Sequence, residues 1–282
     1  MVSLAKRQTP FPPCLPRGSP EKLVDCTKKG GVCSLRLFSK SAESNQVSIA
    51  PGNLGTLRTT CPYRFQQNRM IFSWIGEMIL GHSHPQIVSE IGFLEREAVT
   101  GTGDQDDGDF ENVGRIDNVL IYPESQPMLW CALEIQAVYF SGANMTSEFK
   151  RLRTFSEDSL PFPAGNRRPD YRSSGPKRLM PQLQIKVPSL RRWGKKMAVV
   201  VDQDFFAALG RMDDVKDVSN CDVAWFIVKY DESSGEAILT PDRVQLTTLE
   251  RAVEGLTGGR AVSLETFESR ILEKLTRNTD AP

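Results

Sequence analysis

The fold is decided by two short stretches, Gly114-Arg115-Ile116-Asp117-Asn118-Val119-Leu120 and Leu129-Trp130-Cys131-Ala132-Leu133-Glu134-Ile135-Gln136. Both are rich in branched and aromatic residues, and the turn-forming segment 122–127 separates them, so they predict a β-hairpin. The hairpin brings the carboxylates of Asp117 and Glu134 side by side, and strand alternation places Glu134 and Gln136 on one face. Two acids in apolar sequence are costly unless they are paired or hold a cation, and Mg²⁺ takes oxygen ligands of this kind.

The two strands resemble the catalytic core of the PD-(D/E)XK nucleases, in which an Asp on one strand and a Glu-x-Lys on the next hold Mg²⁺ beside a scissile phosphate. The third position of that motif is Gln136 here instead of Lys, a departure known in part of the superfamily. The resemblance implies that Asp117 and Glu134 bind Mg²⁺ and that Gln136 completes the catalytic set. Taken alone, the pattern also fits an ordinary hairpin with surface carboxylates.

Four cysteines precede the hairpin: Cys14, Cys26, Cys33 and Cys61. Their flanks are rich in Gly, Pro and Lys, as expected of loops that wrap a metal, and four thiolates suit a closed tetrahedral site for Zn or Fe. Their spacing contains no C-x2-C pair, so unrelated thiols or two disulfides are the alternatives. Residues 1–20 lack the continuous apolar core of a signal peptide, and a reducing compartment disfavours disulfides.

The chain resembles the NotI family of type II restriction endonucleases in the order of its motifs, which are the four cysteines, Cys61-Pro62-Tyr63-Arg64-Phe65, Gly114-Arg115-Ile116-Asp117-Asn118-Val119 and Leu133-Glu134-Ile135-Gln136. The resemblance extends from about Cys14 to Gln136. It implies a PD-(D/E)XK core, a four-cysteine iron site and a homodimer that cuts GC-rich palindromic DNA. It also implies that the four cysteines are the metal ligands, although four thiolates do not distinguish Fe from Zn.

Basic residues gather in one segment of a chain whose net charge is zero. Residues 165–196 contain ten Lys and Arg residues against the single acid Asp170. A local basic stretch is typical of a phosphate-contacting surface, although a solvated, Pro-rich loop is the alternative. We expect this segment to contact DNA through Arg167, Arg168, Arg172, Lys177, Arg178, Arg191, Arg192 and Lys195.

The chain is long enough for one large domain or for one domain with a small appendage. We expect a cysteine-rich metal-binding subdomain over residues 1–62 and a nuclease domain over residues 63–282, which together give an α/β fold with a mixed sheet flanked by helices. Residue patterns predict helices over 63–81, 85–98, 143–157, 205–211 and 264–277, with Ser263 as the N-cap of the last, and strands over 197–202, 222–230 and 240–247.

A glutamate on the first predicted helix is a further candidate for the active site. The leading helix of the PD-(D/E)XK fold often supplies another acid, and Glu77 is the residue in that place. Glu77 also follows Arg69 and Ser73 at helical spacing, so an ordinary exposed glutamate is an equal alternative.

Three functions fit these patterns. The hairpin and the resemblance favour a Mg²⁺-dependent, sequence-specific DNA endonuclease. A non-catalytic, metal-stapled DNA-binding protein and a DNA repair or junction nuclease are the alternatives. Because no apolar run is long enough to span a bilayer, we expect no membrane association and a location in the bacterial cytoplasm.

Overall fold

A mixed six-stranded sheet forms the centre of the computed structural model, which describes residues 14, 22, 24–27, 33–40, 47–97, 110–142, 168–258 and 262–279. In spatial order the strands are β12 (Ile238–Thr247), β11 (Val223–Asp231), β10 (Met197–Asp202), β7 (Leu129–Ile135), β6 (Phe110–Tyr122) and β5 (Gln86–Glu97). Strands β5, β6 and β7 form an antiparallel meander. Strands β7, β10 and β11 are parallel, and β12 returns antiparallel to β11. The architecture is therefore a mixed α/β fold, as expected, and it is compatible with a nuclease core.

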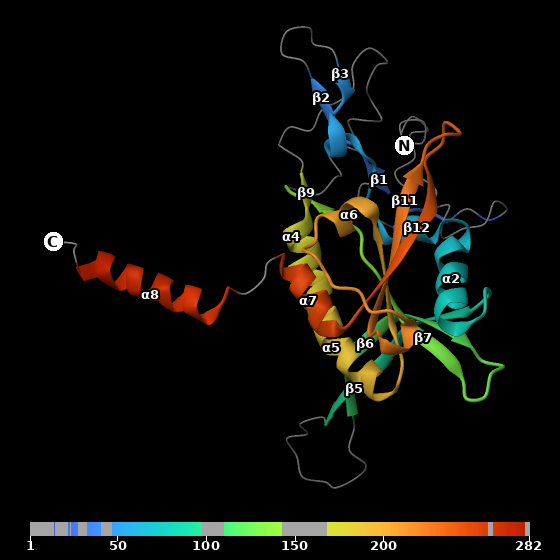
Figure 1. Cartoon of the computed structure of the whole chain (residues 1–282). Helices are drawn as coiled ribbons and strands as arrows, with labels where there is room; N and C mark the ends of the chain where they lie inside the picture. Colours follow the sequence, from blue (N-terminus) through green and yellow to red (C-terminus); the bar gives the residue numbers. More distant parts are fainter. Residues whose placement is uncertain are drawn as a thin grey trace, which may run out of the picture.

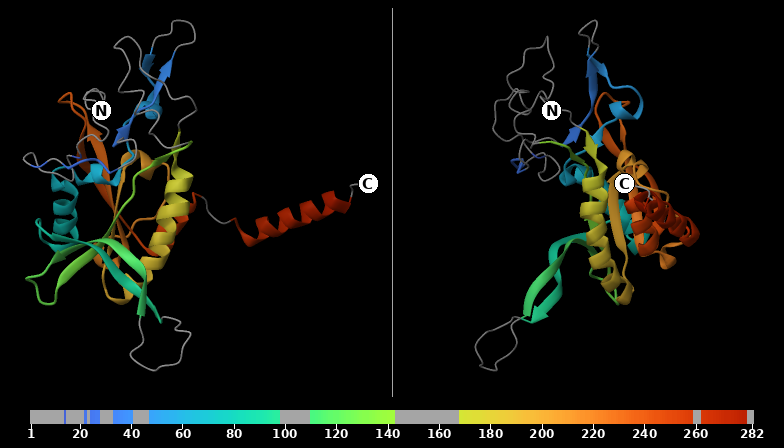
Figure 2. Two further views of the ribbon diagram at one scale, coloured as in Figure 1. Left: turned by 180° about the vertical axis from the view of Figure 1, so that it is seen from behind. Right: turned by 90° about the vertical axis from the view of Figure 1, so that its left-hand side faces the viewer.

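Helices cover both faces of the sheet (Figure 1, Figure 2). One face carries α5 (Met180–Arg192) and α7 (Leu249–Thr257), and the other carries η2 (Pro62–Arg69), α2 (Met70–Ile75) and η3 (Gly76–Leu80). The position of strand β10 between the two helical layers explains why its sequence is apolar at every position but the last. Val199 and Val201 lie in the core cluster with α5 and α7, whereas Ala198 and Val200 lie in the cluster with α2. A strand covered on both faces has no polar side.

Shorter elements complete the described part of the chain. Towards the N-terminus these are β1 (Ser34–Leu35), β2 (Phe38–Lys40), β3 (Val47–Ile49), η1 (Gly52–Gly55) and β4 (Arg58–Thr59). Further along they are β8 (Tyr139–Phe140), β9 (Pro169–Asp170), α4 (Tyr171–Ser174), η4 (Gly175–Leu179), α6 (Gln203–Ala207) and η5 (Val218–Asn220). The last helix, α8 (Leu264–Thr279), stands apart from the body in Figure 1. None of the helices described here combines the length and the apolar character needed to cross a bilayer.

Many of the expected elements are confirmed. The hairpin is β6 and β7, and β10, β11 and β12 lie where strands are expected. The short helix after β10 is α6, which begins at Gln203 rather than at 205. The final helix is α8, and the Thr266 N–H donates to the Ser263 hydroxyl at 3.2 Å, which confirms the N-cap. The helix expected over 143–157 lies outside the described residues.

The helix expected over 85–98 is wrong, because this segment is the edge strand β5. Its apolar residues recur every three or four positions, which favours a helix in the sequence. The structure gives this spacing another cause. Glu90 has a φ of 56°, and the register with β6 shifts between Gly92 and Leu94. These irregularities interrupt the alternation of an otherwise extended strand.

The helix expected over 63–81 is present but broken. Asn68 and Arg69 both have positive φ values, of 53° and 56°, so the chain turns between η2 and α2. The last turn, η3, is wound as a π-helix and is followed by Gly81, whose φ of 73° suits glycine.

Helices α5 and α7 have no counterpart among the expected elements. The prolines of the basic segment hide α5 in the sequence, since proline is unfavourable in helix interiors. Pro181 lies just after the π-helical turn η4, which joins α4 to α5 without a break, and Pro188 lies inside α5.

Candidate active site

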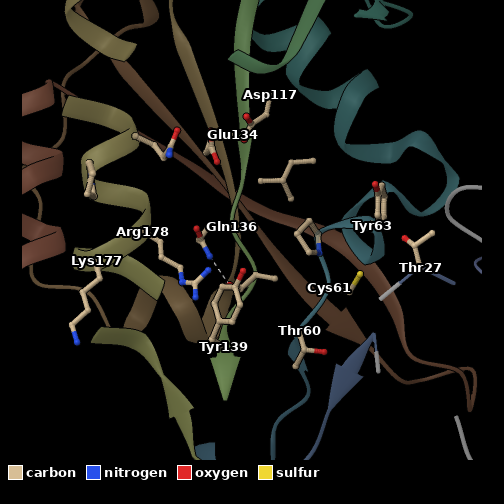
Figure 3. Close-up of a pocket in the computed structure, with 15 residues that line it drawn as sticks. Thr27, Thr60, Cys61, Tyr63, Asp117, Glu134, Gln136, Tyr139, Lys177 and Arg178 are labelled. Atoms are coloured by element: carbon tan, nitrogen blue, oxygen red, sulfur yellow. Dashed lines mark hydrogen bonds between the residues drawn. The ribbon is translucent and has the colours of Figure 1, made fainter. Parts of the chain in front are cut away.

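Strands β6 and β7 place the two predicted carboxylates next to each other. Their register pairs Asn118 with Leu133 and Val119 with Ala132. One further step along this register sets Asp117 opposite Glu134, on the sheet face that α5 covers. Figure 3 shows both carboxylates at the upper end of the same pocket. The hairpin geometry expected for this pair is therefore observed.

The two carboxylates have different surroundings. The Asp117 side chain is 57 % exposed, whereas that of Glu134 is 10 % exposed. Burial raises the pKa of Glu134 to about 7, the positive charge of Lys186 acts to lower it, and the nearby Asp117 raises it again. The site thus holds one solvated acid and one acid whose charge depends on a neighbouring cation.

That cation comes from helix α5. The Lys186 Nζ donates to Glu134 Oε2 at 2.9 Å and lies 3.6 Å from Asp117 Oδ1. Leu183, Val187 and Leu190 lie in the core cluster on this face of the sheet, and they fix the helix so that Lys186 points into the sheet as well. Lys186 is 2 % exposed. Lys186 is one of the ten basic residues in segment 165–196, but it is not among the eight that are expected to contact DNA, and no pattern in the sequence marks it as a site residue.

Gln136 follows directly after β7 and is buried. Its backbone N–H donates to Val200 O at 3.0 Å, which ties it to β10. Its side-chain nitrogen donates to Ala137 O at 2.6 Å, the contact drawn as a dashed line in Figure 3. The structure therefore brings Asp117, Glu134 and Gln136 to one place.

These three side chains line an open pocket with a volume of about 660 Å³. Lys177 and Arg178, from the turn of π-helix before α5, line the same pocket. The Arg178 guanidinium lies over the Tyr139 ring, 3.8 Å from its centroid, as Figure 3 shows. The pocket therefore joins a carboxylate pair to a basic margin.

The other predicted DNA-contacting residues extend from just before β9 to just after α5. Arg168, Arg172 and Arg192 are exposed, and Arg167 lies outside the described residues. At the far end of α5, the Arg191 guanidinium is paired with Asp222 at 2.5 Å and with Glu250 at 3.1 Å. Lys195 donates to Met128 O at 3.1 Å. The geometry therefore favours the residues near the pocket over Arg191 and Lys195.

Glu77 is not brought to this pocket. Its side chain is exposed on η3, and it is not among the residues that line the pocket. The positive φ values at Asn68 and Arg69, which redirect the chain before α2, could not be read from the sequence.

The segments that carry the four predicted cysteine ligands are joined two by two through backbone hydrogen bonds. The Cys14 N–H donates to Val24 O at 2.6 Å, close in the chain to Cys26. The Thr60 N–H donates to Cys33 O at 3.0 Å, which sets Cys33 beside the segment of Cys61. Thr27, Thr60 and Cys61 all line the pocket. Among the described residues, however, no group of three or more His, Cys, Asp or Glu side chains is arranged to hold a metal.

A family model described as "Restriction endonuclease NotI" matches residues 2–239, which include the four cysteines, both strands of the hairpin and helix α5. The comparison with curated proteins finds no match.

Proposed function

This chain belongs to the NotI family of type II restriction endonucleases, which are site-specific deoxyribonucleases, and we propose that it cuts a GC-rich palindrome in double-stranded DNA with Mg²⁺ held by Asp117 and Glu134. The observation that carries this proposal is the convergence of both carboxylates on one cation, the Lys186 ammonium. The preference for GC-rich DNA rests on the family alone.

The donor set fits Mg²⁺. Two carboxylates on adjacent strands, one exposed and one buried, offer the oxygen ligands that this ion prefers while leaving room for water. When bound, Mg²⁺ supplies positive charge that lowers the pKa of a water and stabilises the phosphate oxygens.

The chain's own residues would then divide the work. Asp117 and Glu134 hold the ion, and the Gln136 carboxamide orients a water or a phosphate oxygen. In the hydrolysis, a water oxygen forms a bond to phosphorus, and the bond from phosphorus to one bridging ester oxygen breaks. One proton of the water is released, and one proton ends on the departing oxygen.

We place the DNA along the pocket margin. Lys177 and Arg178 line the pocket, and Arg172 lies exposed on α4, which leads directly into their π-helical turn. Phosphate contacts from such residues position the duplex, and an arginine that reaches a guanine edge adds sequence recognition.

The working unit in this proposal is a homodimer. Each chain carries one carboxylate pair on β6 and β7, and one such site hydrolyses one strand at a time. A two-fold axis shared by the protein and a palindromic site would set one active site at each strand.

The four cysteines would hold a structural Fe or Zn in a subdomain over residues 1–62. Supporting this, the segments of Cys33 and Cys61 are joined by a backbone hydrogen bond, as are the segments of Cys14 and Cys26. A closed thiolate site would contribute directly to the folding of these short segments.

Two carboxylate variants test the catalytic proposal. With Mg²⁺, the wild type should cut phage or genomic DNA into discrete fragments. Asp117→Asn and Glu134→Gln should cut roughly 100- to 1,000-fold more slowly or not at all, because each weakens the cation site. Both should still bind a duplex that contains the mapped site, since phosphate contacts lie elsewhere.

Glu254→Gln is the matched control. Glu254 is an exposed acid on α7 that pairs with Arg251, away from the pocket, so this variant should cut like the wild type. Wild-type rates in both pocket variants would exclude this site. A wild type that binds DNA but never cuts it would favour the non-catalytic DNA-binding protein.

A further inference from the structure

Lys186 is a buried cation that the strand motif does not contain. In the PD-(D/E)XK pattern a lysine stands two residues after the glutamate, and this chain has Gln136 there. The Lys186 ammonium reaches the same pair of carboxylates from a different element, helix α5. The site therefore has a positive charge, although its strand motif lacks one.

Stability does not explain why a lysine stands at this position. Lys186 is 2 % exposed, and its neighbours Leu183, Val187 and Leu190 are fully buried in the core cluster. Taking a Lys and a Glu out of water costs several kcal/mol per ion, and an apolar residue of the same size is often as stable or more so. An apolar residue at 186 would also complete the apolar face of α5.

We propose that Lys186 is a catalytic residue. Its ammonium does not itself line the open pocket, but it reaches the two carboxylates that do, and from there it contacts the scissile phosphate and supplies a positive charge that Gln136 cannot. The inference rests on the proposed nuclease function. Charge develops on the phosphate oxygens as water attacks, and a fixed cation in a partly dry site stabilises it strongly. The ammonium gains and loses no proton in this role.

The test first removes the positive charge at position 186 and then restores a positive charge at position 136. Lys186→Met keeps the length of the side chain and removes its charge. It should fold with a melting temperature at or above that of the wild type, and should bind the mapped duplex with unchanged affinity. Single-turnover cleavage with saturating Mg²⁺ should fall roughly 100- to 1,000-fold. Lys186→Met with Gln136→Lys should recover at least tenfold of that loss, roughly 1.4 kcal/mol in barrier height.

Binding of Mn²⁺ separates a catalytic cation from a positioning one. If Lys186 serves the phosphate, its removal takes a competing charge from the carboxylates, and Mn²⁺ affinity should stay equal or rise. If Lys186 merely holds the carboxylates in place, Mn²⁺ affinity should fall together with cleavage, and that result would overturn the proposal. Should Lys186→Met fail to fold, Lys186→Gln takes its place in the same measurements.

Lys229→Met is the control, because Lys229 pairs with Asp242 at 3.3 Å on β11, away from the pocket. It should cut at the wild-type rate. Failure of the nuclease proposal looks different from failure of this inference. The first leaves the wild type inactive, whereas the second leaves Lys186→Met within tenfold of an active wild type whose Glu134→Gln variant is inactive.

Discussion

Asp202 is a buried carboxylate that the proposed chemistry does not use. It is 2 % exposed, and it accepts hydrogen bonds from the Thr59 N–H at 2.7 Å and the Phe205 N–H at 2.8 Å. It therefore caps helix α6 and fastens β4 to the end of β10. Burial raises the pKa of Asp202 from 3.8 to about 6, against the lowering effect of the two backbone hydrogen bonds.

Because of this raised pKa, the contribution of Asp202 to the stability of the protein decreases as the pH rises. The folded state holds the Asp202 proton more tightly than the unfolded chain does. The corresponding stability is present below about pH 3.8 and is lost as pH rises through about 6. In Asp202→Asn this loss is absent. From about pH 4 to about pH 7, the free energy of unfolding of the variant should gain roughly 2 kcal/mol relative to wild type.

Urea unfolding at the two pH values measures this difference directly. A constant difference between the two proteins across that range would mean that the Asp202 carboxyl titrates as it does in the unfolded chain.

At the scale of elements, helix α5 is the support on which the buried lysine depends. Leu183 is fully buried in the core cluster that α5 shares with the sheet. Leu183→Ala should therefore lower the free energy of unfolding by about 2–5 kcal/mol, because it removes buried methyl groups and leaves a cavity.

Ile185 on the same helix is the control, since its side chain is 52 % exposed. Ile185→Ala should change the free energy of unfolding by no more than about 0.5 kcal/mol in urea titrations. Equal effects of the two substitutions would show that α5 is not packed on the sheet in this orientation.

Some of the strands can be predicted from the sequence and others cannot. The hairpin of β6 and β7 is readable because its turn is short and both strands are strongly apolar. Strand β10 is readable because burial on both faces makes nearly every position apolar. Strand β5 is not, since the positive φ at Glu90 and the register shift after Gly92 give it the apolar spacing of a helix.

The residues of the candidate site also differ in whether the sequence predicts their proximity. Asp117, Glu134 and Gln136 lie on one hairpin, so their proximity follows from local geometry. Lys186 lies 52 positions from Glu134 in the chain. Its approach depends on how α5 crosses the sheet, which local pattern does not encode. The prolines around α5 further conceal the helix that carries it.

At the scale of the whole molecule, helix α8 is separate from the folded body. Its described side chains, from Leu264 to Leu275, are all exposed, and they include Phe267, Ile271 and Leu272. A chain that ends at Gly258 should therefore unfold with a free energy within about 1 kcal/mol of the full chain, because it loses no core contact. Urea titrations of both chains measure this.

A loss of several kcal/mol that grows with protein concentration would contradict this expectation. It would indicate that α8 is buried against a second copy, as linkage between folding and association requires.

The central claim is that this molecule cuts both strands of DNA at one short sequence. A digest of a sequenced genome with purified protein and Mg²⁺, followed by mapping of every fragment end, tests it most directly. We predict discrete fragments whose paired ends all fall within the same GC-rich palindrome, and no cleavage when EDTA removes the metal. Ends scattered without a common sequence, single-strand nicks alone, or intact DNA would contradict it.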